Sequence, residues 1–173
     1  MVNLPTLITL SRIVIIIPFI LVAPEHPLIA AILFSIAGLT DLLDGYLARK
    51  TQSVTKLGIL LDPIADKLLV ISALILFVDL EVVPAWIAII IIAREFIVTG
   101  LRIAALTKEI VIPAEMGGKL KVTAQISSIL LLFLDRTFLT FDLYGIGMLM
   151  LWIAMILGII SGVQYFILFW KRI

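Results

Sequence analysis

The stretch Leu143–Trp170, LYGIGMLMLWIAMILGIISGVQYFILFW, contains no charged residue. A helix that crosses the hydrocarbon core of a bilayer needs about 20 consecutive, mostly apolar residues. This stretch meets that requirement, so it predicts a transmembrane helix close to the C-terminus. The question that follows is whether the rest of the chain is built for the same apolar solvent.

The composition of the whole chain gives the same answer. Of its 173 residues 63% are hydrophobic and only 14% are charged, whereas soluble domains have roughly 45–50% and 25%. The net charge of +1 does not favour a nucleic-acid partner. The absence of cysteine excludes disulfides and thiolate metal sites. The single histidine, His26, precedes Pro27 in a short connection and is expected to be a loop residue.

Apolar stretches recur along the chain and are separated by short polar connections. We expect an all-α integral membrane protein with six transmembrane helices, preceded by a short N-terminal interfacial segment at Leu4–Leu10 and folded as one domain over residues 1–173. No basic n-region or small-residue cleavage site marks the N-terminus as a removable signal. The expected spans are Ser11–Val22 (with Pro18 inside it), Pro27–Ala48, Leu57–Val78, Pro84–Leu106, Gly118–Leu134 and Leu143–Trp170.

Basic residues are distributed unevenly over the connections between these spans. The connections fall into two sets, on opposite sides of the membrane. One set carries most of the lysines and arginines, whereas in the other set Arg136 is the only strong base. Cytoplasmic connections carry the excess of lysine and arginine. Both termini and the second connection are therefore expected on the cytoplasmic side of the cell membrane. The residues of the basic side are Arg49, Lys50, Lys56, Lys108, Lys119, Lys121, Lys171 and Arg172.

Four aspartates interrupt the apolar sequence around the second connection. Asp41 and Asp44 are three residues apart at the end of one expected helix, and Asp62 and Asp66 are four apart at the start of the next, so each pair shares a helix face. Two antiparallel helices would bring the pairs together, where unscreened carboxylates repel. Hard cations such as Mg²⁺ or Mn²⁺ take oxygen ligands of this kind. Two divalent cations are the cofactors that we expect here.

Two other interpretations of the aspartates remain open at this point. They could form structural salt bridges with Arg49, Lys56 or Lys67, or a cation or proton path in a small transporter. Their place near one membrane surface, rather than at the midplane, disfavours the transporter. Glycine allows a close approach of ligand to backbone and arginine recognises phosphate, which together favour phosphoryl chemistry on a lipid headgroup. The neighbours that carry this argument are Gly45, Gly58, Arg49 and Thr55.

The spacing of these residues resembles a known signature. The pattern Asp41-x-x-Asp44-Gly45-x-x-Ala48-Arg49, continued by Gly58-x-x-x-Asp62-x-x-x-Asp66, is similar to the motif of the CDP-alcohol phosphotransferase family. The resemblance extends over nearly the whole chain. Three further stretches resemble the bacterial branch that makes phosphatidylglycerophosphate: NLPTLITLSR (3–12), IAREFIVTGLR (Ile92–Arg102) and GKLKVTAQ (Gly118–Gln125).

The resemblance implies a reaction, a set of roles and a homodimer. CDP-diacylglycerol would react with glycerol-3-phosphate to give phosphatidylglycerophosphate and CMP; a related enzyme with another acceptor alcohol is the alternative. Asp41, Asp44 and Asp62 would bind the two metals, with Asp66 close to them as the general base. The residues implied for CDP-diacylglycerol binding are Thr6, Gly45, Arg49 and Thr55.

The acceptor is a dianion and needs cations of its own. Arg94, Arg102, Lys119 and Lys121 are the candidates for binding glycerol-3-phosphate. Arg94 lies deep in an apolar run, where an unpaired guanidinium is costly, so a salt bridge with Glu95 or with an aspartate is an equally good interpretation of it. The pair Gly158-x-x-x-Gly162 favours close helix packing, either within the chain or in a dimer.

Overall fold

The computed structural model describes residues 4–51, 56–107, 116–137 and 142–171. Within these ranges the chain is helical and contains no β-strand. Side-chain environments are described for residues 13–40, 67–105, 118–137 and 142–171. The helices are α1 (Leu4–Val22), α2 (Pro27–Thr51), α3 (Lys56–Asp79), α4 (Ala85–Thr107), α5 (Met116–Asp135) and α6 (Leu143–Lys171).

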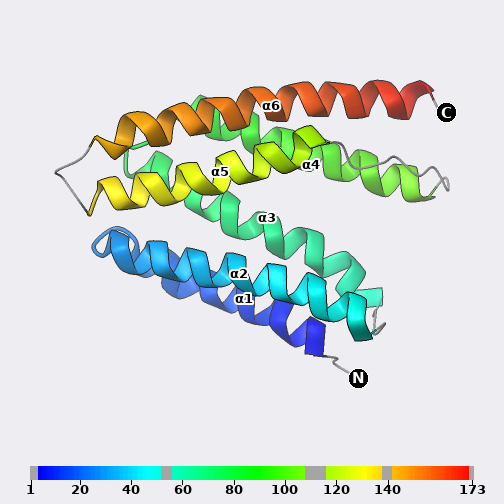
Figure 1. The fold of residues 1–173 in the computed structure, drawn as a ribbon, viewed down its shortest axis with the longest axis horizontal. Helices are drawn as coiled ribbons and strands as arrows, with labels where there is room; N and C mark the ends of the chain where they lie inside the picture. The colour runs from blue at the N-terminus through cyan, green and yellow to red at the C-terminus, as the bar shows by residue number, and fades with distance from the viewer. Residues whose placement is uncertain (1–3, 52–55, 108–115, 138–141, 172–173) are drawn as a thin grey trace.

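The helices run back and forth along one long axis (Figure 1). In that view α3 lies obliquely between the α1–α2 pair and the group formed by α4, α5 and α6. The end of α2, the start of α3, the end of α4 and the start of α5 lie at the same end of the bundle as both chain termini. We call this the motif end, because α2 and α3 carry the aspartates there.

The predicted all-α architecture is confirmed within the described residues, with some differences at the helix boundaries. The largest concerns Leu4–Leu10, which we expected to be a separate interfacial segment. It is instead the first part of one continuous helix, α1, that also contains Pro18. A proline inside a helix removes one backbone hydrogen bond and crowds the carbonyl four residues earlier, yet α1 continues past Pro18 to Val22. The helix α5 also begins slightly earlier than predicted, at Met116.

Four phenylalanines form the centre of the hydrophobic core, away from the motif end. Phe133 of α5 contacts Phe19 of α1 with ring centroids 5.7 Å apart and Phe77 of α3 at 4.5 Å. Phe34 of α2 completes the group against Phe19 at 6.2 Å. All four rings are buried. Four helices are therefore joined by one aromatic cluster, which leaves the other half of the bundle free for polar groups.

The helices α5 and α6 approach each other closely at Gly147. A Cβ atom at this position would lie 2.9 Å from a methyl carbon of Leu132, which is itself buried. The hydroxyl of Ser128 donates a hydrogen bond of 2.7 Å to the Gly147 carbonyl oxygen. The absence of a side chain at Gly147 thus sets the spacing of the α5–α6 pair, whose other half carries part of the polar site.

The outer surface of the bundle is largely apolar. Large hydrophobic side chains are exposed along the helices, among them Leu21 of α1, Ile89 of α4 and Val163 of α6. Extended exposed apolar surfaces mark contacts with membranes or other proteins. Among the described residues, one helix, α6, is long and apolar enough by itself to cross a membrane.

Candidate functional site

The backbone brings the two aspartate pairs to the same end of the bundle. Asp41 and Asp44 belong to the last turns of α2, and Asp62 and Asp66 to the first turns of α3. The two helices converge at the motif end and diverge away from it (Figure 1). The side chains of all four aspartates lie outside the described residues, so their role as metal ligands stays a prediction.

Three of the residues predicted to bind CDP-diacylglycerol belong to helix ends at the motif end of the bundle. Thr6 is in the first turns of α1, and Gly45 and Arg49 are in the last turns of α2. Their side chains lie outside the described residues, and Thr55 falls in the gap at 52–55. The backbone therefore gathers helix ends from α1, α2 and α3 at the motif end, as the predicted site requires.

Arg94 of α4 is held by three groups. Its Nε donates a hydrogen bond of 2.9 Å to the carbonyl oxygen of Gly158, and one terminal nitrogen donates to the Ser161 hydroxyl at 2.7 Å. The other terminal nitrogen forms a salt bridge of 3.0 Å with the Glu95 carboxylate. The salt bridge that we weighed against an acceptor role for Arg94 is therefore present.

The same carboxylate oxygen of Glu95 also pairs with Lys121 of α5. Only 4% of the Lys121 side chain and 13% of the Glu95 side chain are exposed. An ion pair with so little water around it is stable only when its remaining polar groups are also satisfied. Gly158 and Ser161 of α6 satisfy Arg94, and we call the group Arg94, Glu95, Lys121 and Ser161 the polar cluster.

The small residues of α6 make room for this cluster. A Cβ atom at Gly158 would meet side-chain carbons of Lys121 at 3.6 Å and of Arg94 at 3.7 Å, and one at Gly162 would meet Arg94 at 3.5 Å. The Gly158-x-x-x-Gly162 pattern thus packs against α4 of the same chain. Of the two interpretations given above, packing within the chain is the one observed.

The other two predicted acceptor residues are exposed. Arg102 lies further along α4, toward the motif end, with its guanidinium 6.0 Å from the ring centroid of Tyr165 of α6. Lys119 lies near the start of α5. The structure thus separates the four predicted cations into a largely buried pair, Arg94 and Lys121, and an exposed pair, Arg102 and Lys119.

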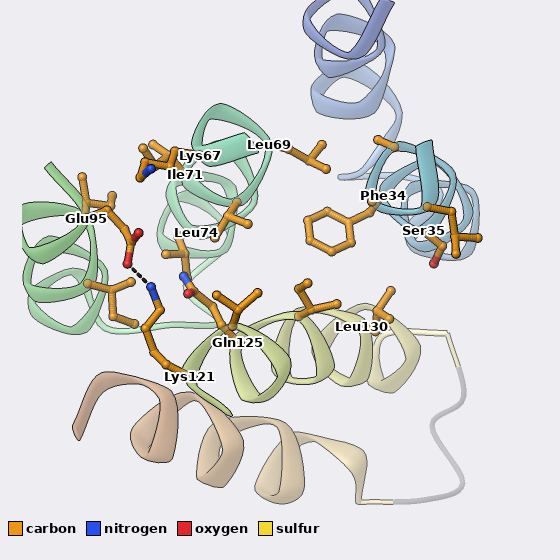
Figure 2. Close-up of a pocket in the computed structure, with 18 residues that line it drawn as sticks. Phe34, Ser35, Lys67, Leu69, Ile71, Leu74, Glu95, Lys121, Gln125 and Leu130 are labelled. Carbon is orange, nitrogen blue, oxygen red and sulfur yellow. Dashed lines mark hydrogen bonds and ion pairs between the residues drawn. The ribbon is translucent and has the colours of Figure 1, made fainter. Parts of the chain in front are cut away.

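A pocket of about 550 Å³ lies between α2, α3, α4 and α5 (Figure 2). Most of its wall is apolar, and its polar residues include Lys67, Glu95, Lys121 and Gln125. Its apolar lining comprises Phe34, Ala37, Gly38, Leu39, Leu69, Val70, Ile71, Leu74, Ile91, Ile92, Val122, Ile126 and Leu130.

The pocket adjoins the aspartate motif by helix register. Gly38 lines the pocket and precedes Asp41 by three residues on α2, and Val70 lines it and follows Asp66 by four on α3. Residues three or four apart lie on the same helix face, one turn or about 5–6 Å along the axis. The two faces that carry motif aspartates thus continue directly into the wall of the pocket.

Two polar residues of this region received no role from the sequence. Ser161 lies between the two glycines of α6, and Gln125 ends the stretch Gly118–Gln125 that carries part of the family resemblance. Each is a polar side chain inside an expected transmembrane span, and both are buried. That is the signal that could have identified them, because buried polar groups are normally there to make a hydrogen bond.

Comparisons with known proteins agree with the resemblance found in the motif. The profile of the CDP-alcohol phosphatidyltransferase family matches residues 2–160. Three similar proteins are named CDP-diacylglycerol–glycerol-3-phosphate 3-phosphatidyltransferase. The one from Bacillus subtilis is 42% identical over 100% of this chain and 98% of its own. Those from Haemophilus influenzae and Rickettsia bellii are 41% and 39% identical, covering 94% and 95% of this chain and 91% and 93% of theirs.

The polar cluster makes a prediction about stability. Glu95→Gln leaves two largely buried cations without their carboxylate, and breaking a buried ion pair in this way costs about 3–5 kcal/mol. We expect a large drop in the thermal unfolding temperature of the detergent-solubilised protein. Adding Lys121→Met to Glu95→Gln should recover part of the loss, because it removes one of the unpaired charges. Lys119→Met, at an exposed lysine of the same helix, is the control. Equal melting temperatures for Glu95→Gln and Lys119→Met would contradict the role of Glu95 as the shared partner of Arg94 and Lys121.

Proposed function

Because the chain belongs to the CDP-alcohol phosphatidyltransferase family, we propose that it transfers the phosphatidyl group of CDP-diacylglycerol to glycerol-3-phosphate. The products are phosphatidylglycerophosphate and CMP. The observation that carries the proposal is that relatives with this one activity in their name match nearly the full length of the chain. Relatives with an enzyme's name also favour the enzyme over the transporter considered above.

The setting of the reaction is a membrane. We propose that all six helices span the cell membrane, with the motif end and both termini facing the cytoplasm. The exposed apolar side chains along the helices and the basic residues at the motif end support this orientation. A homodimer is proposed from the family resemblance alone. Its contact would use a surface other than the Gly158–Gly162 face, which α4 covers.

The aspartates are proposed to hold two divalent cations, Mg²⁺ or Mn²⁺. Carboxylate oxygens suit these ions, and the helix ends that carry Asp41, Asp44 and Asp62 converge in the backbone. When bound, such ions polarise a diphosphate and stabilise the charge of the departing phosphate. Four carboxylates at one place also need cations to remain ionised together, so the donor set fits the proposed metals.

The remaining residues of the motif are proposed to bind and orient the lipid substrate. Arg49 suits a phosphate group, because its guanidinium can donate two parallel hydrogen bonds to two of the phosphate oxygens. Gly45 allows a close approach of the nucleotide to the backbone of α2, and Thr6 and Thr55 would add hydroxyl donors. Asp66 is proposed to take the proton of the acceptor hydroxyl as its oxygen attacks the phosphorus of the phosphatidyl group. The bond from that phosphorus to the oxygen of CMP then breaks.

The acceptor is proposed to bind at the exposed cations of the motif end. Glycerol-3-phosphate is water-soluble and must arrive from the cytoplasm, where Arg102 of α4 and Lys119 of α5 are accessible. Arg94 and Lys121 are already engaged by one carboxylate. Arg94, Lys121 and Glu95 together retain a net positive charge, which attracts the acceptor phosphate from within the bundle. We therefore assign direct phosphate contact first to Arg102 and Lys119.

The proposed activity is tested with a panel of acceptors. Purified protein with CDP-diacylglycerol and Mg²⁺ should release CMP with glycerol-3-phosphate, and much more slowly with glycerol, serine or inositol-1-phosphate. Release should stop with EDTA and return with added Mg²⁺. Liquid chromatography with mass spectrometry identifies the lipid product. Transfer to another acceptor at a higher rate would replace the proposed substrate but keep the family chemistry, and no transfer to any acceptor would refute the proposal.

The metal ligands are tested by Asp62→Asn, which keeps the size of the side chain but removes its charge. Metal stabilisation of transition-state charge amounts to several kcal/mol and each ~1.4 kcal/mol is a factor of ten in rate. We therefore expect kcat to fall about a hundredfold or more. Asp79→Asn, at an exposed aspartate at the other end of the same helix, is the matched control. Near-normal turnover of Asp62→Asn at low millimolar Mg²⁺ would rule out the metal assignment.

The acceptor site is tested by Arg102→Ala. Loss of a hydrogen bond to a charged group costs about 1.5–3 kcal/mol, so the KM for glycerol-3-phosphate should rise roughly ten- to a hundredfold, with little change for CDP-diacylglycerol. Lys171→Ala removes an exposed cation near the C-terminal end of α6 and should leave both KM values unchanged. If Arg102→Ala affects both substrates equally, or neither, Arg102 does not bind the acceptor phosphate, and the acceptor site moves away from α4 toward the lysines of α5.

A further inference from the structure

Gln125 of α5 is a buried polar residue whose donor has no partner. Its side chain lines the pocket between α2, α3, α4 and α5, and only 3% of the residue is exposed. The amide nitrogen, Nε2, makes no hydrogen bond. In Figure 2 the amide extends from α5 into the pocket, toward Leu74 of α3. Since leaving a buried donor unpaired costs free energy, the orientation of this amide suggests a ligand that accepts its hydrogen bond.

The walls of the pocket indicate an apolar ligand. Its deep side is formed by buried side chains, including Phe34, Leu74 and Ile91, while Leu39 of α2 and Val122 and Ile126 of α5 are exposed to the surroundings of the bundle. The pocket therefore opens between α2 and α5 onto the apolar outer surface. Its volume of about 550 Å³ lies in the range of small-molecule sites, about 300–1,000 Å³. A ligand with hydrocarbon chains can enter from that side without crossing water.

The polar groups are placed in an order along the pocket. Lys67 directly follows Asp66 on α3, and Lys121 precedes Gln125 by one helical turn, about 6 Å along α5. Because α5 begins at the motif end, Gln125 lies deeper in the bundle than Lys121. The charged groups therefore lie toward the aspartates. Beyond them, Ser35 of α2 donates to the carbonyl oxygen of Ala31, so among the described side chains that line the pocket the donor left without a partner is the neutral amide of Gln125.

We propose that Gln125 Nε2 donates a hydrogen bond to an ester carbonyl of the diacylglycerol part of the lipid substrate, whose acyl chains occupy this pocket. The inference rests on the function proposed above and deepens it. An ester carbonyl is a neutral acceptor that lies a few bonds from the phosphate in such a lipid, so it suits a neutral donor that lies beyond the charged end of the pocket. A dianion is a poorer fit at Gln125, because most of the pocket wall is apolar and the cations that line it, Lys67 and Lys121, lie toward the aspartates.

In this proposal Gln125 is a positioning residue that also determines specificity. It takes no part in the chemistry at phosphorus, but it sets how deeply the lipid lies in the pocket and hence where its diphosphate meets the aspartates. A carbonyl acceptor is present only when the chains are ester-linked. A lipid with the same chains joined through ether bonds has no carbonyl oxygen for the amide, so the wild-type enzyme should discriminate between the two.

The test compares two CDP-activated lipids of equal chain length, one ester-linked and one ether-linked, with glycerol-3-phosphate as acceptor in mixed detergent micelles. One neutral hydrogen bond corresponds to about a two- to tenfold preference, so the wild type should use the ester lipid with a kcat/KM higher by that factor. Gln125→Leu keeps the approximate size but removes the donor. The Gln125→Leu variant should lose the preference for the ester lipid, because its KM for the ester lipid rises. Its KM for glycerol-3-phosphate should stay unchanged.

The same substitution at an exposed glutamine of α6, Gln164→Leu, is the matched control and should keep the wild-type preference. A wild type that uses both lipids equally well would overturn the proposal, even if Gln125→Leu fails to fold. The proposal would also be overturned if Gln125→Leu lowered kcat/KM for both lipids by the same factor. A packing role of Gln125, or a pocket filled by a bulk lipid, predicts that result. Failure of the wild type to release CMP from either lipid would instead refute the proposed function.

Discussion

One carboxylate on α4 holds two cations that come from different helices. Glu95 accepts from its neighbour Arg94 and from Lys121 of α5, and Arg94 in turn donates to α6 through Gly158 and Ser161. Charged groups in such an apolar bundle are costly unless they are paired and their remaining donors are satisfied. These contacts can form only at one relative register of α4, α5 and α6. The polar cluster therefore determines how the three helices face the pocket and the motif end.

The two ends of the bundle are stabilised by different interactions. Away from the motif end, Phe19, Phe34, Phe77 and Phe133 join α1, α2, α3 and α5 in a close-packed aromatic core. Nearer the motif end, ion pairs and hydrogen bonds replace this packing. The aromatic core is stabilised without charged groups, whereas a reaction between phosphates needs cations and carboxylates close to water. The close-packed aromatic half thus supports the half of the bundle that carries the charged and polar side chains.

The proposed reaction joins substrates of opposite solubility, and the arrangement of the site provides a separate approach for each. The pocket opens between α2 and α5 onto the apolar surface, which suits a lipid that arrives from within the bilayer. Arg102 and Lys119 are exposed where α4 ends and α5 begins, which suits a small phosphate ester that arrives from water. In this proposal the two routes meet at the aspartate motif, which the backbone places in the last turns of α2 and the first turns of α3. The headgroup would then react at the boundary while the acyl chains stay in the apolar phase.

The sequence alone determined the helices, the spacing of the aspartates and the family, because each depends on neighbours in the chain. Apolar runs predict helices through local periodicity, and Asp41, Asp44, Asp62 and Asp66 share faces through the geometry of a single turn. Even so, local reasoning separated Leu4–Leu10 from the helix that it continues into. The tertiary structure alone decided that Arg94 and Lys121 share Glu95, that Gly158 and Gly162 pack inside the chain, and that Gln125 faces a pocket with its donor unpaired. Those facts depend on which faces of distant helices meet, and an apolar helix carries too little pattern around its circumference to specify that from its own residues.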